Sequence, residues 1–385
     1  ISISMQIVPG GHLLVKWDDG VPDGVLPMWV ADMDFRTAPA VVEALRRRVE
    51  HGIYGYAIPP EAYAESIRGW FLRRHGWAPE REWIHPVTGV IPALSAILRA
   101  MTRPGDKVLI QPPVYNHFYI AIANSGCTPE ESNLVLDGNR YRIDFEDLER
   151  RAADPAVKLM LLCNPHNPAG RVWTPDELRR IGEICLRHDL FIIADEIHCE
   201  LVMPGFRYTP LRLARRTVPA ALGDLHVAQQ GLQPGRSAGG QHLRRRTPDT
   251  RGRIVRALEI NETGMISPFA IEALMAAYNE GDAWLDALNE YLWGNYVELR
   301  DHFAARLPQF PVLPLEGTYL VWIDCRAAGL SSAELDRRLT AEARVRINPG
   351  AMYGAAGEGF IRVNIACPRA LLREGIKRMT DLLTR

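Results

Sequence analysis

The sequence predicts an α/β protein with a mostly parallel sheet, followed by a smaller C-terminal α+β domain. Short apolar runs rich in branched residues alternate with helical periodicity through the middle of the chain, at 107–113, 158–165 and 190–196. Apolar strands of this kind are typical of a parallel sheet that is covered on both faces. The length of 385 residues allows two or three domains of roughly 150 residues each.

The helix between the second and third runs is marked at its start. Thr174 precedes Pro175, and the apolar residues Leu178, Ile181 and Cys185 lie on one helical face. Threonine is a good N-cap, and proline is favoured at the first helical position. The pattern therefore predicts a crossover helix that joins two parallel strands.

The C-terminal part of the chain has a different pattern. Apolar residues at multiples of helical spacing predict one long amphipathic helix from about Asp282 to Leu307. Strands are expected at 319–324, 344–347 and 360–366, with a closing helix from Arg369. We expect residues 1–45 to form an N-terminal arm and part of the small domain, residues 46–280 the large domain, and residues 281–385 the small domain.

The composition excludes several classes of partner. The 45 basic and 46 acidic residues leave a net charge of −1, so no overall field attracts nucleic acid or an anionic membrane. The six cysteines form no CxxC pair and no metal-ligand spacing, which favours reduced thiols in a cytoplasmic protein. No apolar stretch suits a membrane span, and residues 1–11 lack the features of a signal peptide. The expected partner is a small molecule.

Polar residues directly follow two of the predicted strands. In a parallel sheet such positions meet at one edge, where ligands bind. Residues 159–163 are followed by two Asn-Pro pairs, the second of which begins at Asn167. Residues 191–194 are followed by Asp195 and then, three residues on, by His198. Taken alone, the first segment is compatible with a plain turn and the aspartate with a helix cap.

A third signal is a glycine before a helix. Gly89 allows a tight turn, and the amide groups of Val90 and Ile91 then open the helix. Free N–H groups and the helix dipole at such an end bind phosphate, although one glycine is a weak signal. In this order and at these separations, the three segments together resemble the aminotransferase class I/II family. That resemblance implies pyridoxal phosphate as cofactor and the fold of the type I pyridoxal-phosphate enzymes.

Further segments narrow the resemblance to one branch of the family. They are similar to the cystathionine β-lyases of MalY/PatB type, and they are LPMWVADMDF at 26–35, HGIYGYAIP at 51–59, QPPVYNHF at 111–118, GTYLVWID at 317–324 and FIRVNIACPR at 360–369. The resemblance covers almost the whole chain except one segment. It also implies a homodimer, because the family builds its site across two subunits.

The resemblance assigns four residues to the cofactor ring. Asp195 matches the aspartate that holds the pyridine nitrogen and keeps the ring protonated. His198 and Asn167 match residues beside the ring's 3-oxygen. Tyr115 matches the aromatic residue stacked on the ring, although simple packing is an equally ordinary role for a tyrosine after a strand.

The resemblance also assigns the two ends of the ligand. Residues 89–91 would cradle the phosphate, and either Tyr54 or Tyr56 would reach it from the other subunit. Arg362 matches the arginine that binds the α-carboxylate of the substrate, a bidentate task that suits a guanidinium. Without the resemblance, Arg362 would be interpreted as a solvated strand residue.

The chain lacks the lysine that this chemistry needs. In the family, a lysine forms a Schiff base with the cofactor and moves the Cα proton, and it follows the aspartate segment by a few tens of residues. The four lysines are at 16, 107, 158 and 377, in contexts that predict surface positions. The expected window, Val218 to Arg253, has no apolar periodicity, is rich in Gly, Gln and Arg, and places Gln230 where the lysine belongs.

A shifted reading frame accounts for this window. From Gly223 onward, the last two bases of each codon and the first base of the next can encode Val-Thr-Phe-Met-Ser-Pro-Ser-Lys-Ala-Phe-Asn-Leu-Ala-Gly-Leu. The lysine codon would straddle Gln230 and Gly231. This peptide is similar to the lysine segment of the family, and family-like sequence resumes after Arg253. We therefore hypothesise a compensated pair of frameshifts.

Three functions follow, in order of preference. The first is a pyridoxal-phosphate-dependent C–S β-lyase that converts an amino-acid thioether such as cystathionine to a thiol, pyruvate and ammonia. The second is an aminotransferase, because the same fold and cofactor serve both reactions. The third is a catalytically inactive binding or regulatory protein, which the missing lysine favours and the retained site residues oppose.

Overall fold

The computed structural model describes residues 13–214, 240–242 and 248–385. Its largest sheet confirms the predicted α/β class. Four parallel strands lie in the order β4 (Thr128–Glu131), β3 (Lys107–Ile110), β7 (Val157–Cys163) and β8 (Phe191–Asp195). Because they run in one direction, their carboxyl ends meet at one edge of the sheet.

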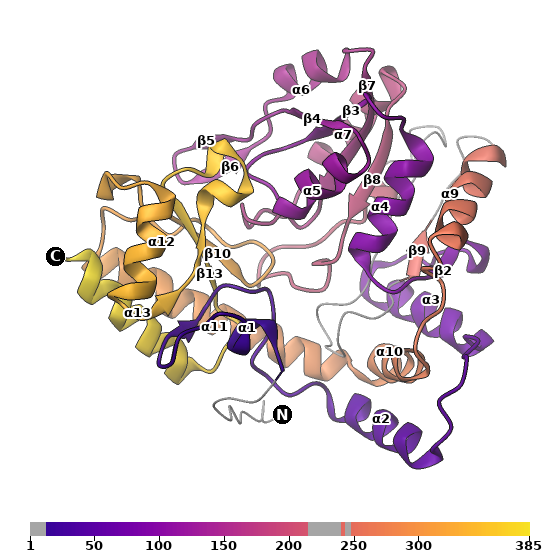
Figure 1. Cartoon of the computed structure of the whole chain (residues 1–385), viewed down its shortest axis with the longest axis horizontal. Helices are drawn as coiled ribbons and strands as arrows, with labels where there is room; N and C mark the ends of the chain where they lie inside the picture. The colour runs from indigo at the N-terminus through magenta and orange to yellow at the C-terminus, as the bar shows by residue number, and fades with distance from the viewer. Residues whose placement is uncertain (1–12, 215–239, 243–247) are drawn as a thin grey trace.

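Successive strand residues point to opposite faces of this sheet and enter two separate cores. One core joins Val108 and Ile193 to helices α4 (Val90–Met101), α5 (Asn116–Asn124) and α9 (Pro248–Ile260). The other joins Leu109 and Ile192 to α6 (Phe145–Ala152) and α7 (Pro175–Arg187). Figure 1 shows the sheet surrounded by these helices. Burial on both faces explains why β3, β7 and β8 are largely apolar, whereas β4 at the edge of this sheet is polar and exposed or half-buried.

The predicted crossover helix is confirmed as α7, including its N-cap. The Thr174 hydroxyl accepts a hydrogen bond from the Glu177 amide at 3.2 Å, and the Glu177 carboxylate accepts one from the Thr174 amide at 2.8 Å. This reciprocal capping box satisfies two N–H groups that the helix itself leaves open.

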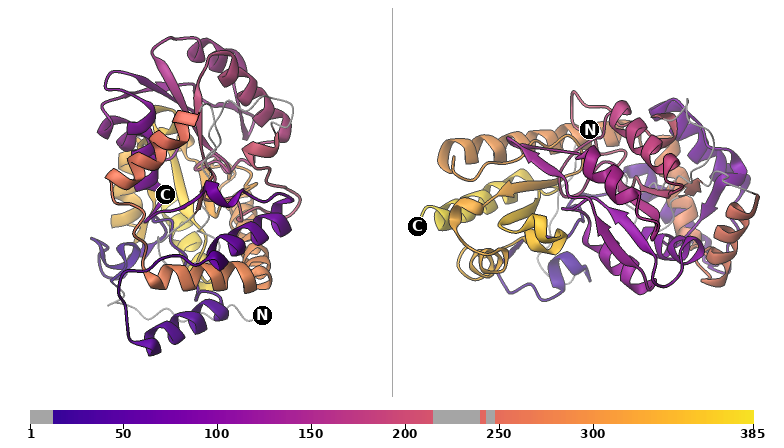
Figure 2. Two further views of the ribbon diagram at one scale, coloured as in Figure 1. Left: turned by 90° about the vertical axis from the view of Figure 1, so that its right-hand side faces the viewer. Right: turned by 90° about the horizontal axis from the view of Figure 1, so that it is seen from above.

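Further elements surround the sheet. Helices α2 (Pro39–His51) and α3 (Glu61–His75) both pack on α10 (Pro268–Glu280), and Figure 2 shows α2 at the periphery of the molecule. The smaller elements are η1 (Arg81–Trp83), the antiparallel pair β2 (Ile84–Pro86) and β9 (Gly240–His242), the antiparallel pair β5 (Val135–Asp137) and β6 (Arg140–Arg142), and α8 (Leu211–Ala214).

The C-terminal part begins with the predicted long helix, α11 (Asp282–Arg306), and contains a second sheet. Strand β13 (Phe360–Asn364) lies antiparallel between β10 (Leu320–Asp324) and β12 (Asn348–Pro349). The remaining elements are η2 (Arg326–Ala328), α12 (Ser332–Ala341), η3 (Gly350–Tyr353), η4 (Ala355–Gly357) and the closing helix α13 (Arg369–Leu383).

The N-terminal residues join this C-terminal part. After α1 (Val15–Asp18), strand β1 (Leu26–Pro27) pairs in parallel with β11 (Val345–Arg346). The pairing places the segment after β1 beside β13, since the Asn364 amide donates to the Met28 carbonyl at 2.9 Å. The limits of the three predicted domains remain a prediction.

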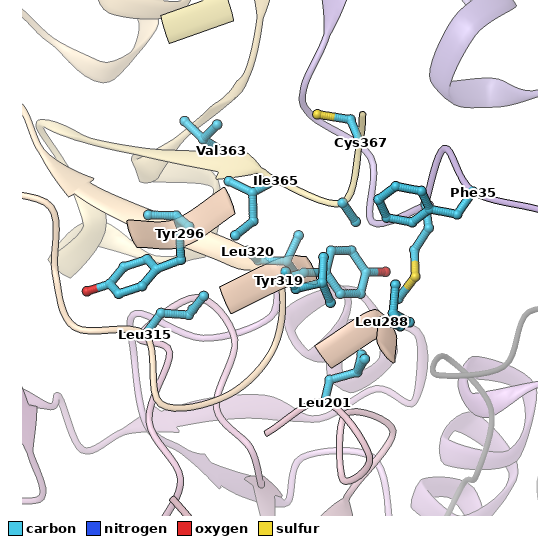
Figure 3. Packing of buried hydrophobic residues seen from close by; sticks show 14 of the residues in the cluster. Phe35, Leu201, Leu288, Tyr296, Leu315, Tyr319, Leu320, Val363, Ile365 and Cys367 are labelled. Carbon is cyan, nitrogen blue, oxygen red and sulfur yellow. The ribbon is translucent and has the colours of Figure 1, made fainter. Parts of the chain in front are cut away.

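One hydrophobic core connects the two parts of the molecule. It runs from α2, α3 and α10 through α11 to β10, β13 and α13. Figure 3 shows Leu288 and Tyr296 of α11 near Tyr319, Leu320 and Ile365, with Leu201 from the segment after β8 close by. Leu201 and Met203, which follow β8, belong to this core, so it joins the segment after the large sheet to β10 and β13.

The prediction that all four lysines lie at the surface is wrong for Lys16. Its side chain is 1% exposed, and its ammonium group pairs with Asp34 at 2.6 Å. Lys158 and Lys377 are exposed, and Lys107 is half-buried. The error has a physical cause, because a lysine is buried when a carboxylate from a neighbouring segment compensates its charge. Within the described residues, no helix is both long and apolar enough to cross a membrane.

Candidate active site

Asp195 is a buried carboxylate at the end of strand β8, with only 3% of its surface exposed. Its Oδ1 atom accepts a hydrogen bond from the Ile197 amide at 3.2 Å, and no cation of the described chain forms an ion pair with it. Burial raises the pKa of Asp195 to about 6, against the lowering effect of the Ile197 amide and with a further raising effect of Glu196. A buried carboxylate in this position favours a ligand that brings a proton or a positive charge.

Arg362 faces the same region from β13 and is also buried, at 3% exposure. Its guanidinium donates to Asn167 Oδ1 at 3.1 Å and to the Trp29 carbonyl at 2.8 Å, and it lies 5.0 Å from the centre of the Tyr353 ring. Within the described residues its Nε atom has no hydrogen-bond partner. The interpretation of Arg362 as a solvated strand residue is therefore wrong, and a buried cation with a free donor fits an anionic ligand.

His198 is buried beside these groups in a neutral form. Burial lowers its pKa to about 3, and the positive charge of Arg362 lowers it further. The imidazole contacts the Tyr319 ring edge-on at a centroid distance of 6.0 Å. Its Nδ1 atom has no partner in the described part of the chain, so the ring can offer a hydrogen bond to a ligand at neutral pH.

The turn that carries His198 is anchored to helix α3. The buried Glu200 carboxylate accepts hydrogen bonds from the Trp70 indole at 2.6 Å and from His75 Nε2 at 2.8 Å, and Arg74 lies 3.8 Å away. His75, Cys199 and Glu200 are near enough to one another to hold a metal ion. The charge of Glu200 is already matched by these donors, however, so this group is explained as a structural anchor.

The two Asn-Pro pairs have different partners. Asn164 donates its side-chain amide to Glu196 at 2.9 Å and to the Thr209 carbonyl at 3.1 Å, and its backbone amide bonds to the Asp195 carbonyl at 3.0 Å. Asn164 therefore fixes the ends of β7 and β8 relative to one another. Asn167 contributes its oxygen to Arg362, which orients its Nδ2 donor away from the arginine.

The predicted phosphate end begins at Gly89, the N-cap of α4. No side chain caps this helix. The first N–H groups of an uncapped helix lack intrahelical acceptors, and they suit an anion. Tyr115 is half-buried at the start of α5, after β3, where its ring packs against His117 and Phe118 at 5.2 and 5.9 Å.

Tyr54 and Tyr56 are not brought to the buried group within one chain. Tyr54 is 49% exposed, with its hydroxyl donating to the Val49 carbonyl at 2.6 Å and its ring against Phe269 at 5.1 Å. Tyr56 is 94% exposed. Gln230, predicted to take the place of the lysine, lies outside the described residues.

Two site residues were not predicted from the sequence. Tyr319 is buried against His198, and its hydroxyl donates to the Ala31 carbonyl at 2.7 Å. Trp29 supplies the carbonyl that orients Arg362. Both lie in segments that carry the family resemblance, but neither has a polar pattern that would mark a role in the site.

Comparisons with known proteins agree with this geometry. The family model for aminotransferase class I and II matches residues 24–379. The chain belongs to the aminotransferase class I and II family. It is 40% identical to the cystathionine β-lyase PatB of Bacillus subtilis over 97% of both chains, and 33% identical to the protein MalY of Escherichia coli over 97% of this chain and 96% of that one.

A solved structure shows the same fold with the cofactor of the family. Cystalysin from Treponema denticola, whose structure contains pyridoxal 5′-phosphate, superposes with a TM-score of 0.94 at 30% identity, over 99% of this chain and 98% of cystalysin. The resemblance to the MalY/PatB branch is thus confirmed, as is the expected fold class. Pyridoxal phosphate is the cofactor that a family member of this kind uses, and the uncompensated Asp195 carboxylate and the buried Arg362 fit its ring nitrogen and an amino-acid carboxylate.

Proposed function

We propose that the protein is a pyridoxal-phosphate-dependent C–S β-lyase that acts on an amino-acid thioether such as cystathionine and releases a thiol, pyruvate and ammonia. The observation that carries the proposal is the burial of both Asp195 and Arg362 in the region of His198. Among the described residues, no cation pairs with the Asp195 carboxylate and no carboxylate pairs with the Arg362 guanidinium, whose Nε atom also has no hydrogen-bond partner there. The relatives with stated activities, PatB among them, support the lyase reaction.

Each buried residue has a task in this proposal. Asp195 would hold the protonated ring nitrogen, and the ring, when bound, would supply a sink for the electron pair left at Cα. Asn167 directs its Nδ2 donor to the 3-oxygen of the ring, because its own oxygen is engaged by Arg362. His198, which is neutral, donates a hydrogen bond in the same region. Arg362 binds the α-carboxylate with donors that its protein partners leave free.

The phosphate end of the site is proposed to need a second subunit. The amides after Gly89 come from one chain, and the exposed Tyr56 reaches the phosphate from the partner in a homodimer. Tyr54 is the weaker candidate because its hydroxyl already donates to the Val49 carbonyl. Tyr115 is proposed to stack on the ring. The six cysteines are all buried and form no disulfide, which supports the proposal of a reducing cytoplasmic location.

Turnover depends on the lysine that the written sequence lacks. None of the four lysines can replace it: Lys16 is paired with Asp34, Lys107 and Lys158 lie at the starts of β3 and β7, opposite the edge that carries Asp195, and Lys377 is exposed on α13. We propose that the segment from Gly223 to about Arg253 derives from a compensated frameshift. If the peptide is as written, we expect cofactor binding with very little turnover.

The test compares two versions of the chain. One has the written sequence, and the other is encoded in the shifted frame from Gly223 to about Arg253. We expect the second to release pyruvate from cystathionine without any keto-acid acceptor, and a third version with alanine at the restored lysine to lose that activity. Strict dependence on an acceptor would instead establish an aminotransferase. Failure of both versions to bind pyridoxal phosphate would refute the proposal.

A further inference from the structure

Lys16 occupies an unusual position for a lysine in a short surface helix. In α1 the ammonium side chain is 1% exposed, whereas Val15 is 52% exposed and Leu14 before it 48%. A buried ion pair adds little to stability compared with apolar packing, because both charges lose their hydration. We therefore explain the pair by the two segments of the chain that it holds together.

The ion pair ties α1 to the segment formed by residues 28–34. The Lys16 ammonium donates to Asp34 Oδ2 at 2.6 Å and to the Asp32 carbonyl at 3.1 Å. Asp34 Oδ1 accepts the Trp17 indole N–H at 2.8 Å. Both carboxylate oxygens of Asp34 are therefore held by consecutive residues of α1.

Segment 28–34 is in turn bound to strand β13. The Asn364 amide donates to the Met28 carbonyl at 2.9 Å, and the Asp34 amide donates to the Ala366 carbonyl at 2.8 Å. Between these two points the Asn364 side chain bonds to the carbonyls of Val30 and Asp32, at 2.5 and 2.7 Å. Figure 3 shows Phe35, directly after the segment, close to Cys367 on the chain that follows β13.

Trp29 connects α1 to Arg362 of the candidate site. Its indole N–H donates to the Lys16 carbonyl at 3.0 Å, and its ring lies 3.7 Å from the Arg346 guanidinium. Its own carbonyl accepts from Arg362 at 2.8 Å and from Asn348 at 3.0 Å. Trp29 thus bonds directly to both residues, through its indole to the Lys16 backbone carbonyl and through its own carbonyl to the Arg362 guanidinium.

We propose that Lys16 and Asp34 are positioning residues that lock segment 28–34 on β13, so that the Trp29 carbonyl holds the Arg362 guanidinium ready for the substrate carboxylate. The inference rests on the proposed function, since it assigns the pair to amino-acid recognition. The Lys16–Asp34 pair contacts neither the proposed ring site nor the proposed phosphate site. Its loss should therefore weaken only the part of the ligand affinity that depends on the substrate carboxylate.

The experiment uses two ligands that need no lysine. Phosphopyridoxyl-L-alanine and phosphopyridoxyl-ethylamine are stable conjugates that differ only in the carboxylate, and calorimetry gives the ratio of their dissociation constants for the 385-residue chain. We expect the wild-type chain to prefer the alanine conjugate. Lys16→Met should reduce this preference about tenfold, the size expected when a hydrogen bond to a charged group is misplaced.

Two further variants separate positioning from stability. Lys16→Met combined with Asp34→Asn removes the uncompensated carboxylate, so it should fold more stably than Lys16→Met and still lose the carboxylate preference. Lys107→Met is the matched control. Lys107 also pairs with carboxylates, at 2.8 Å from Glu130 and Asp154. It lies at the start of β3, however, at the edge of the large sheet opposite to the one that carries Asp195. It should lower stability without changing the ratio.

Hydrogen exchange provides a second readout that needs no ligand. In Lys16→Met, the amides of Asp34 and Asn364 should exchange faster than in Lys107→Met, because they bind segment 28–34 to β13. Unchanged exchange would show that the ion pair does not hold segment 28–34 on β13. Faster exchange with an unchanged ligand ratio would reduce the pair to a structural role and overturn its positioning role. A wild-type chain that binds neither conjugate would refute the proposed function, and the inference with it, before any variant is compared.

Discussion

The buried group around Asp195 and the segment of residues 52–58 differ in how completely one chain builds them. Asp195, His198 and Arg362 are each 3% exposed and lie among hydrogen-bonded neighbours. In residues 52–58, Ile53, Tyr56 and Ile58 are 68%, 94% and 89% exposed. Apolar side chains at this exposure are typical of a surface that another subunit covers.

The difference suggests that one chain builds the ring and carboxylate end of the proposed site, whereas the phosphate end needs a second subunit. For the ring and carboxylate end of the proposed site, one chain supplies the buried Asp195 after β8 and the buried Arg362 on β13. For the proposed phosphate end, the described residues of the same chain offer the start of α4. We therefore expect substitutions around Asp195 to act on ligand chemistry and substitutions in 52–58 to act through association.

The largest effect is expected from Arg362→Leu. Loss of charge-assisted hydrogen bonds of about 1.5–3 kcal/mol each should reduce kcat/KM of the lysine-restored chain by roughly 100- to 1000-fold. Arg326→Leu is the matched control, because Arg326 also lies over an aromatic ring of the same sheet, at 4.9 Å from Phe360, but pairs with Asp324 instead. Comparable losses in both variants would contradict the role of Arg362.

Asp195→Asn should have opposite effects with and without ligand. A pKa raised by burial from 3.8 to about 6 means that the ionised carboxylate destabilises the ligand-free protein by ~3 kcal/mol at pH 7. The destabilisation develops as the pH rises from 3.8 towards 6, so the stabilising effect of asparagine should be full at pH 7 and vanish near pH 4. Urea unfolding at both pH values measures it.

The same variant should bind pyridoxal phosphate more weakly, because an amide cannot stabilise a protonated ring nitrogen. A variant that is neither more stable without ligand nor weaker in binding would show that Asp195 is not the uncompensated carboxylate of the site. This prediction sharpens the comparison, since no residue of 52–58 should show such a pH dependence.

A smaller effect is expected at the tyrosines. Tyr56→Phe should weaken the binding of pyridoxal phosphate about tenfold, the loss of one hydrogen bond to a charged group. Tyr54→Phe serves as the control, because it removes only the bond to the Val49 carbonyl. Isothermal titration at several protein concentrations measures both, and equal effects or none would remove Tyr56 from the proposed interface.

The smallest effect tests whether stability alone alters the site. Thr174→Ala removes the capping box of α7 and should lower the free energy of unfolding by about 1 kcal/mol while leaving ligand affinity unchanged. Thermal unfolding and calorimetry give the two values. A loss of ligand affinity in Thr174→Ala would mean that the site responds to general destabilisation. The effects of the other variants could then not be assigned to one region or the other.

The sequence predicted the parts of the site that lie next to one another in the sheet. Asp195, His198 and Asn167 follow parallel strands, and apolar runs that end in polar residues reveal such positions. The burial of Arg362 and Lys16 could not be read in this way. Arg362 depends on a carbonyl 333 residues away in the sequence, and Lys16 on an aspartate 18 residues away in an irregular segment. Neither contact joins residues at a helical or strand spacing, so no periodic pattern in the sequence marks it.

The most direct test of the account is a peptide map of the protein from its natural source after borohydride reduction in the presence of pyridoxal phosphate. The account predicts a Ser-Lys-Ala-Phe-Asn peptide that carries a phosphopyridoxyl group on its lysine. An unmodified peptide containing Gln229-Gln230-Gly231-Leu232-Gln233 would contradict it. The buried Asp195 and Arg362 would then belong to a binding protein that descends from a lyase.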